Sequence, residues 1–403
     1  MTDRTDVPVV GGSVAGLRTA EALRRFSYPG AVTILEAGNH PPYDRTMLSK
    51  KVLDAGGHAV PVSLRTPEHL DEAGIELRLR SVAEKPDFSQ RTVHLADGSD
   101  IEYSTMVVAT GASARELPGA PRSAVHYLRT LDDAHRLRRA MESARDAVVV
   151  GAGFIGSEVA AAMSARGIMV TVVEPAGYPL GRALGEVIGF RLARLHESRG
   201  VRLVPGRSVT WVGKSESSAA PYSVVLDDGT TLNTELVVVG IGARPNTAWL
   251  EGSGIELGDG VTCDQFCRTS APGVFAVGDV ARWPNALFDE AMRVEHWTNA
   301  VEQAAVVAWN IANPGSPRSY APVPYVWSDQ YGLRLQIIGR PRADDEVRIV
   351  KDDIADGVLV ALFSRQGRLS GAFTVNAPKR LPALRRALAS GASLDQALEA
   401  SDP

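Results

Sequence analysis

The sequence, 403 residues long, predicts an α/β protein in which one strand–turn–helix–strand unit occurs twice. The first unit reads as a strand at 7–11, a helix at 15–25 and a strand at 32–36. An apolar run at 148–150 leads into the glycine turn of the second unit. The last segment, 325–400, alternates in the manner of strands before a helical tail. We therefore predict two Rossmann-like dinucleotide-binding domains, one inserted in the other, followed by a C-terminal α+β domain.

The repeat extends beyond the glycine turns. The hairpin glycine of Asp97-Gly98 stands 13 positions before Gly111, and that of Asp228-Gly229 stands 13 positions before Gly242. Further along, an apolar strand ends at Gly278-Asp279 and returns the chain to the first domain. The predicted boundaries are 1–112 with 246–322 for the first domain, 113–245 for the inserted domain and 323–403 for the C-terminal domain.

Local patterns support the first unit. Leu17, Ala20 and Leu23 fall on one face of the predicted helix at 15–25, as expected for a helix packed on a sheet. The proline-rich stretch at 40–43 then interrupts regular structure, and 320–324 reads as a linker.

Composition excludes several classes of protein. The formal charge of −4, with no long basic run, argues against nucleic acid as a partner. No apolar run approaches the roughly 18 residues that a membrane span needs, so we expect no membrane insertion. The first six residues are polar and resemble neither a secretory nor a transit segment, so we expect the cytoplasm. Cys263 and Cys267 are the only cysteines, which excludes a disulfide scaffold and a four-cysteine metal site; we expect no metal.

A complete dinucleotide-binding motif stands at Gly151, Gly153 and Gly156. The first glycine permits a tight turn, the second lets the backbone approach a pyrophosphate, and the third lets helix and strand pack closely. The N-terminus of the next helix offers N–H groups to the phosphates. Glu174, 18 residues after the third glycine, is expected to accept a ribose 2′-OH and repel a 2′-phosphate, which favours NADH.

The first copy is imperfect, because Ser13 stands between Gly11 and Gly16 where the motif has its second glycine. Serine is small, so a pyrophosphate could still approach the backbone. Glu36, 20 residues beyond Gly16, again ends the following strand and favours a second dinucleotide site. A buried strand–helix turn without a ligand is the alternative interpretation.

Further motifs cover nearly the whole chain, namely Gly11 to Gly16, Glu36, Pro42-Tyr43-Asp44-Arg45, Leu48-Ser49-Lys50, Ala109-Thr110-Gly111, Gly151 to Glu158, Gly278-Asp279, Arg293 to Trp297 and Tyr325 to Gln330. Together they resemble the FAD-dependent ferredoxin reductases. These are the NADH-using members of the pyridine nucleotide-disulfide oxidoreductase fold that serve cytochrome P450 or Rieske-type oxygenase systems. The chain departs from the pattern at Ser13, Cys263 and Cys267.

The resemblance implies an FAD site in the first domain and an NADH site in the inserted domain. Gly11, Gly12 and Gly16 would hold the FAD pyrophosphate, and Glu36 its adenosine ribose. Arg45 and Arg129 would add positive charge, and Asp279 would bond the ribityl or pyrophosphate region. His296 and Trp297 would place backbone N–H groups near the flavin pyrimidine edge, where negative charge grows on reduction. The other residues implied to contact a cofactor are Ser13, Ala15, Val82, Ala109, Thr110, Gly111, Phe154, Ile155, Gly242, Gly278, Glu295 and Trp327.

Lys50 and Glu158 carry the implied catalytic role. The matching lysine of the family lies beside the reactive flavin edge and pairs with the glutamate that follows the second glycine turn. Such a cation would stabilise anionic reduced flavin, and the pair would place the nicotinamide. A solvated surface lysine and an ordinary helical glutamate are the alternative.

Members of the wider fold that reduce disulfides carry a Cys-x4-Cys pair in the first FAD helix region, and peroxidase relatives carry one cysteine near 40–45. This chain has neither, and Cys263 and Cys267 are expected to be structural. Reduced flavin would therefore pass electrons directly to an acceptor. The expected acceptor is a [2Fe-2S] or similar small ferredoxin that serves a P450 or Rieske-type oxygenase. The alternatives are a rubredoxin or other NADH–acceptor reductase, and a redox-sensing flavoprotein resembling apoptosis-inducing factor.

Overall fold

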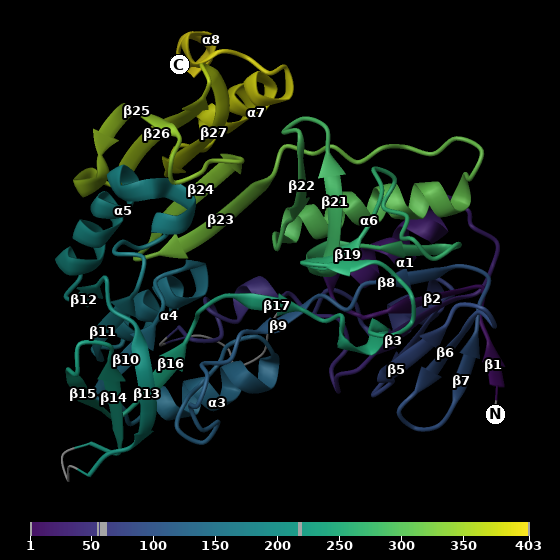
Figure 1. The fold of residues 1–403 in the computed structure, drawn as a ribbon, viewed down its shortest axis with the longest axis horizontal. Coiled ribbons are helices and arrows are strands. Elements are labelled where there is room, and N and C mark those ends of the chain that lie inside the picture. The colour runs from purple at the N-terminus through teal and green to yellow at the C-terminus, as the bar shows by residue number, and fades with distance from the viewer. Residues whose placement is uncertain (1, 55, 57–62, 217–219, 402–403) are drawn as a thin grey trace. The chain divides into compact units, whose positions relative to one another are not determined.

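The computed structural model describes residues 2–54, 56, 63–216 and 220–401, and the chain forms two compact units. The first unit contains Met1–Asp44, Val62–Ser113 and Arg244–Pro324. The second contains Arg45–Pro61, Ala114–Ala243 and Tyr325–Pro403. Each unit is built around its own parallel sheet, labelled in Figure 1, and the predicted α/β class is confirmed.

The first unit has a five-stranded parallel sheet in the order β20-β8-β2-β3-β4. Its strands are β2 (Val7–Val10), β3 (Val32–Glu36), β4 (Ile75–Leu79), β8 (Met106–Val108) and β20 (Val274–Ala276). Helix α1 (Val14–Arg25) packs against the sheet and against α6 (Trp297–Ala312). Leu17, Ala20 and Leu23 of α1 are buried in the core of this unit, as their spacing predicts.

Two smaller sheets complete the first unit. The order β1-β7-β6-β5 joins Thr2–Arg4, Asp100–Glu102, Thr92–Leu95 and Ala83–Asp87, with the Asp97-Gly98 turn between β6 and β7. The order β18-β19-β21-β22 joins Leu257–Gly258, Gly260–Thr262, Ala281–Asn285 and Glu290–Arg293. Helix α2 (Pro67–Glu72) and the 3-10 turns η2 (Ala248–Leu250) and η3 (Gly278–Val280) lie in the connections. The chain passes between the units at β9 (Ala112–Ala114) and β17 (Ala243–Pro245).

The parallel sheet of the second unit has the same topology as strands β8-β2-β3-β4 of the first unit. This sheet has the order β12-β11-β10-β16, formed by Arg202–Pro205, Met169–Glu174, Asp146–Val150 and Val237–Val239. Helices α3 (Leu131–Met141), α4 (Phe154–Ala165) and α5 (Gly181–Ser198) belong to this part. The hairpin sheet β13-β14-β15 (Val209–Lys214, Tyr222–Leu226, Thr231–Thr234) carries the Asp228-Gly229 turn, as predicted. The internal repeat seen in the sequence is therefore a repeat of sheet topology.

The C-terminal part of the second unit is an antiparallel five-stranded sheet followed by two helices. The strand order β23-β24-β27-β26-β25 joins Tyr325–Gln330, Leu333–Gly339, Arg368–Val375, Val358–Arg365 and Glu346–Asp353. Helices α7 (Leu381–Ala389) and α8 (Leu394–Ser401) form the predicted helical tail. Leu184 and Ile188 of α5 share a hydrophobic core with Phe363 and Phe373 of this sheet. This core fixes the C-terminal sheet to the inserted domain.

Helix α5 is adapted to that contact. Gly185 interrupts it with a φ of 69° and a ψ of −176°. A Cβ atom at Gly185 would lie 2.7 Å from the carbonyl oxygen of Ala343, so only glycine fits. Across the ranges that the structure describes, no helix combines the length and apolar character needed to cross a membrane.

Candidate active site

The first glycine turn is shaped by close packing. Gly11 has a φ of 112°, and a Cβ atom there would lie 2.2 Å from the carbonyl oxygen of Ala109. A Cβ atom at Gly16 would lie 1.9 Å from the Gly11 oxygen. Ser13 is the N-cap of α1 without a side-chain capping bond, and no acidic residue occupies the first turn. The first turn of α1 thus contributes no competing carboxylate of its own, which suits an anionic phosphate.

The second turn has the same geometry. Gly151 has a φ of 95° and packs against the carbonyl of Gly240, and Gly156 packs against the carbonyl of Gly151. Gly153 differs, because nothing lies within 4 Å of where its Cβ atom would stand. A side chain at this position does not disturb the fold, which explains how the first copy can carry Ser13.

Glu36 and Glu174 close the two turns. One oxygen of Glu36 accepts the Gly12 amide at 2.7 Å, and one oxygen of Glu174 accepts the Ala152 amide at 2.6 Å. Their second oxygens accept amides two residues further on, from Gly38 and Ala176, both at 2.7 Å. A carboxylate oxygen has a further lone pair, so each glutamate can also accept a ribose hydroxyl. Each turn thus combines a helix N-terminus, which can bind phosphate, with a carboxylate, which can bind ribose. Both turns therefore fit a dinucleotide.

Lys50 and Glu158 lie together in the second unit. Lys50 follows the 3-10 turn η1 (Arg45–Met47), and Glu158 lies in α4. The Lys50 Nζ is 2.9 Å from Glu158 Oε1 and 3.0 Å from Oε2, and it also donates to the carbonyl of Thr46 at 3.2 Å. The side chains are only 13% and 3% exposed. Solvent therefore screens this ion pair little.

The chain around Lys50 is anchored to the same unit. The Arg166 guanidinium donates to the carbonyls of Leu53 and Asp54, both at 2.8 Å. Arg138 donates to the carbonyl of Val52 at 3.4 Å. These bonds hold the backbone after Lys50 in place.

Two serines not singled out from the sequence complete the surroundings of Glu158. Ser49 Oγ donates to Oε2, while Ser328 Oγ donates to Oε1 at 2.6 Å. The Asp329 amide donates to Oε1 at 3.2 Å. Ser49 and Ser328 are buried. The only sequence signal for these two serines was their place beside Lys50 and Trp327.

The remaining predicted residues are distributed over both units. In the first unit, Thr110 Oγ1 donates to the carbonyl of Asn246 at 2.9 Å, Val82 is 43% exposed, and Asp279 lies in η3. Ala15 and Ala109 are buried there, Glu295 pairs with Arg293, His296 is the N-cap of α6 and Trp297 begins that helix. In the second unit, Arg45 begins η1, Arg129 precedes α3, Phe154 and Ile155 begin α4, Gly242 has a φ of 100°, and Trp327 stacks on Tyr325.

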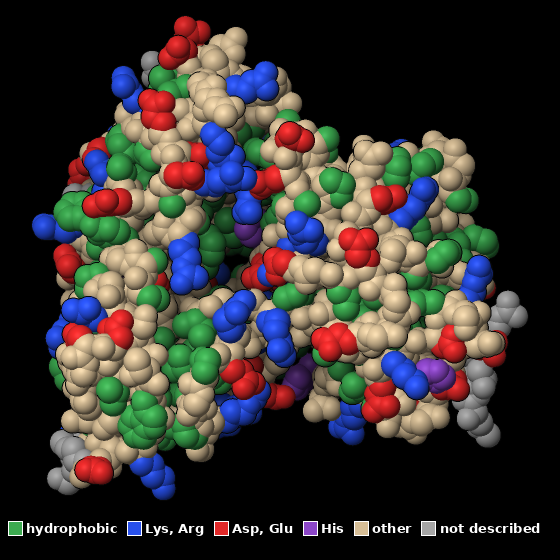
Figure 2. Space-filling model, in the orientation of Figure 1, with side chains coloured by type: hydrophobic (Ala, Val, Ile, Leu, Met, Phe, Trp, Pro, Cys, Tyr) green, Lys and Arg blue, Asp and Glu red, His purple; other side chains and the backbone are tan. Residues whose placement is uncertain are grey.

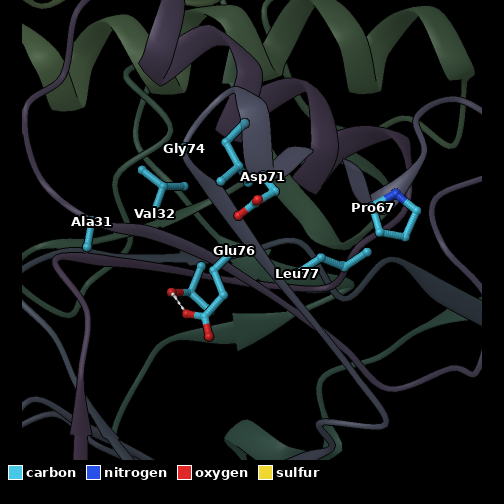
Figure 3. Close-up of a pocket in the computed structure, with 9 residues that line it drawn as sticks. Ala31, Val32, Pro67, Asp71, Gly74, Glu76 and Leu77 are labelled. Carbon is cyan, nitrogen blue, oxygen red and sulfur yellow. Dashed lines mark hydrogen bonds between the residues drawn. The ribbon is translucent and has the colours of Figure 1, made fainter. Parts of the chain in front are cut away.

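The hollow shown in Figure 3 is a different feature. It has a volume of about 430 Å³ and is lined by Ala31, Val32, Thr33, Pro67, Asp71, Gly74, Ile75, Glu76 and Leu77. Thr33 donates to Glu76 there at 2.9 Å. Its lining contains no glycine turn followed by a helix and no predicted site residue, so we place the active-site candidates elsewhere.

The two thiols are buried in the first unit. Cys263 and Cys267 are 7% and 0% exposed, and both are free cysteines. Burial raises the pKa of Cys267 to about 12 and that of Cys263 well above its ordinary value. Both groups are therefore protonated thiols at neutral pH, and a thiol is a poor nucleophile.

Family comparisons cover almost the entire chain. Residues 5–304 match the pyridine nucleotide-disulphide oxidoreductase family, and residues 325–403 match the reductase C-terminal family. The anthranilate 1,2-dioxygenase system ferredoxin–NAD(+) reductase component of Burkholderia cepacia is 35% identical over 390 residues, covering 96% of this chain and 95% of that protein.

Solved structures agree with these matches. The ferredoxin reductase for the CYP199A2 system from Rhodopseudomonas palustris has a TM-score of 0.92 and 35% identity, covering 99% of this chain and 97% of that chain. The reductase in the covalent putidaredoxin reductase–putidaredoxin complex has a TM-score of 0.91 and 28% identity, covering 99% and 96%. The similarity therefore includes the C-terminal sheet as well as both dinucleotide folds.

Proposed function

Because this chain belongs to the pyridine nucleotide-disulphide oxidoreductase family, we propose that it is an NADH-dependent ferredoxin reductase that uses FAD. Its acceptor is a [2Fe-2S] or similar small ferredoxin that serves a cytochrome P450 or Rieske-type oxygenase. The observation that carries the proposal is full-length similarity to such reductases combined with two dinucleotide turns and a buried Lys50–Glu158 pair.

The domain assignment follows the two turns. The FAD-binding domain comprises 1–112 and 246–322, the NAD-binding domain 113–245, and the C-terminal domain 323–403. FAD, when bound, accepts a hydride and releases electrons singly, and this is chemistry that no side chain supplies. Gly11 to Gly16, Glu36, Thr110 and Asp279 would hold FAD, and Gly151 to Gly156 and Glu174 would hold NADH.

The Lys50 ammonium is proposed to stabilise the negative charge that the flavin of FAD would acquire on reduction. A cation held in a site with little solvent stabilises developing charge more strongly than one in water. Glu158 fixes the position of that cation, since its two oxygens lie 2.9 and 3.0 Å from Lys50 Nζ. Ser49 and Ser328 donate to the same carboxylate and hold it in place.

The buried thiols of Cys263 and Cys267 support direct transfer to the acceptor, because neither offers a thiolate for a relay. The proposal includes a cytoplasmic location, where NADH and a ferredoxin are both available.

The test is anaerobic mixing of the FAD-loaded protein with NADH and a [2Fe-2S] ferredoxin, following the visible absorbance of the ferredoxin. Rapid reduction of the ferredoxin is expected. Reduction of rubredoxin alone would favour the rubredoxin reductase alternative. A long-lived NADH–flavin charge-transfer band with slow turnover of every acceptor would contradict the proposal and favour a sensing role.

A further inference from the structure

The turn at Gly278 and Asp279 is fixed from two sides within the first unit. The Gly278 amide donates to Oε1 of Gln303 at 2.7 Å, and Nη1 of Arg293 donates to the carbonyl of Asp279 at 3.1 Å. Gly278 has a φ of 77°, and a Cβ atom there would lie 2.7 Å from the Cβ atom of Ala15. The turn therefore lies directly against α1, the helix that follows the first glycine turn.

The Gln303 side chain has one orientation that satisfies all its neighbours. Its Nε2 donates to Sγ of Cys267 at 3.5 Å while its Oε1 accepts the Gly278 amide. Gln303 and Cys267 are both completely buried. A flipped amide would face the Gly278 N–H with another donor, so the Gly278 amide selects the orientation in which the oxygen faces it, and the Cys267 sulfur accepts from Nε2 in that orientation.

Cys267 is itself held in an unusual backbone conformation. Its φ is 63°, a region that residues other than glycine seldom adopt, and its carbonyl accepts the Ala276 amide of β20 at 3.2 Å. This bond ties the Cys267 backbone to the strand that leads to Gly278. Backbone strain of this kind is retained where the surrounding structure requires it.

We propose that Gln303 is a positioning residue for FAD and that Cys267 holds its amide in place by accepting a hydrogen bond from Nε2. This inference rests on the proposed function, because it requires FAD to bind beside Asp279. A turn fixed before binding presents Asp279 in one conformation. Without the Gln303 oxygen, the backbone of the turn must be ordered when FAD binds, and the entropy of ordering one residue weakens binding by about tenfold.

The experiment measures the FAD dissociation constant of the apoprotein, together with the visible spectrum of the bound flavin. Gln303→Leu removes both hydrogen bonds and is expected to weaken FAD binding by about tenfold. Gln303→Glu keeps an oxygen toward Gly278 and is expected to bind within about threefold of the original protein. Thr234→Val is the control, since it removes a buried side-chain hydrogen bond from the inserted domain and should leave FAD affinity unchanged.

Cys267→Ser and Cys267→Ala isolate the sulfur contact, because both carry the same strain at a φ of 63°. Serine retains an acceptor for Gln303 Nε2 and should bind FAD more tightly than alanine. If Gln303→Leu does not fold, the comparison of Cys267→Ser with Cys267→Ala tests the inference. Equal FAD affinities in these two variants would overturn it. The inference would also be overturned if Gln303→Leu bound FAD as tightly as the unmodified protein does. The same holds if Gln303→Glu and Gln303→Leu weakened FAD binding equally. If the unmodified protein binds no FAD, the proposed function itself fails.

Discussion

Glu36 and Glu174 make the same pair of hydrogen bonds in the two units. Each accepts the amide next to the first glycine of its turn, at 2.7 Å and 2.6 Å, and each accepts the amide two residues beyond itself. Two structurally equivalent carboxylates are thus expected to serve two different cofactors. Variants at these positions can therefore serve as controls for each other.

Cofactor preference is expected to depend chiefly on Glu174. Glu174→Gln keeps an acceptor but removes the charge that repels a 2′-phosphate, so the NADH-to-NADPH ratio of kcat/KM should fall by about tenfold. Glu36→Gln is the matched control and should weaken FAD binding without changing that ratio. Equal kcat/KM values for both nucleotides in the unmodified protein would contradict the prediction. Arg182→Ala shows whether that nearby exposed arginine contributes.

Lys50→Met is expected to slow reduction of bound flavin by NADH at least about tenfold while FAD remains bound, because the buried cation is lost. Stopped-flow absorbance measures this step. Lys51→Met is the matched control, since Lys51 is adjacent but exposed, and its reduction rate should stay unchanged. Similar rates in both variants would leave Lys50 with a structural role alone.

Replacing both Cys263 and Cys267 by serine should leave NADH-to-ferricyanide turnover within a few fold of the unmodified enzyme. The reason is that burial raises the pKa of both thiols, so neither is a thiolate at neutral pH. Steady-state assays at saturating FAD provide the measurement. A collapse of turnover with FAD still bound would reveal a thiol relay.

Stability is expected to fall in mild acid because of His196, whose Nδ1 lies 2.5 Å from the hydroxyl of Tyr331. Burial lowers the pKa of His196 to about 4, whereas its ordinary value is 6.5. The unfolded chain therefore binds a proton between pH 6.5 and 4 that the folded protein does not. The stability that the neutral, buried His196 retains is complete above pH 6.5. As the pH falls toward 4, the free energy of unfolding decreases by about 3 kcal/mol in total.

Thermal unfolding of the protein and of His196→Phe across this pH range tests the prediction. The variant lacks the titrating group, so its Tm should decline less between pH 7 and pH 5. Tyr331→Phe is the control, because it removes the hydroxyl and keeps the buried imidazole. Parallel declines for His196→Phe and the unmodified protein would show that other groups dominate.

For an acidic ferredoxin, docking is expected to use the basic residues of the C-terminal domain, because this chain has a net charge of −4 and attraction then requires a local basic surface. Basic and acidic side chains are interspersed over this domain on the face shown in Figure 2. Charge reversal at Arg340 with Arg342, or at the Lys379, Arg380, Arg385 and Arg386 group, should raise the KM for ferredoxin and leave that for NADH unchanged.

Arg334 is tested in the same way by a single charge reversal, and its Nε lies 2.6 Å from Asp329 Oδ1. If no set alters ferredoxin turnover at low salt, docking uses another surface.

The sequence predicted the local architecture well, because glycine turns are determined by short-range sterics. Gly11 and Gly151 have φ values of 112° and 95°, and a strand and a helix flank each at the predicted positions. The surroundings of Glu158 were only partly predictable. Ser328 is 170 residues away in sequence, and nothing in its local pattern indicates a contact with Glu158. Likewise, Arg45–Pro61 lies within the predicted first domain by sequence but packs with the second unit.

The pairing of β20 with β8 determines the order in which the nascent chain can fold. Val274 aligns with Met106 in parallel register, so the central sheet of the first unit cannot be completed until the whole inserted domain has left the ribosome. The inserted sheet, by contrast, is continuous within 146–239 and can form earlier. Until residue 276 emerges, β8 presents an open edge that another chain could pair with. Synthesis of this protein therefore passes through a stage in which the edge of β8 has no partner strand.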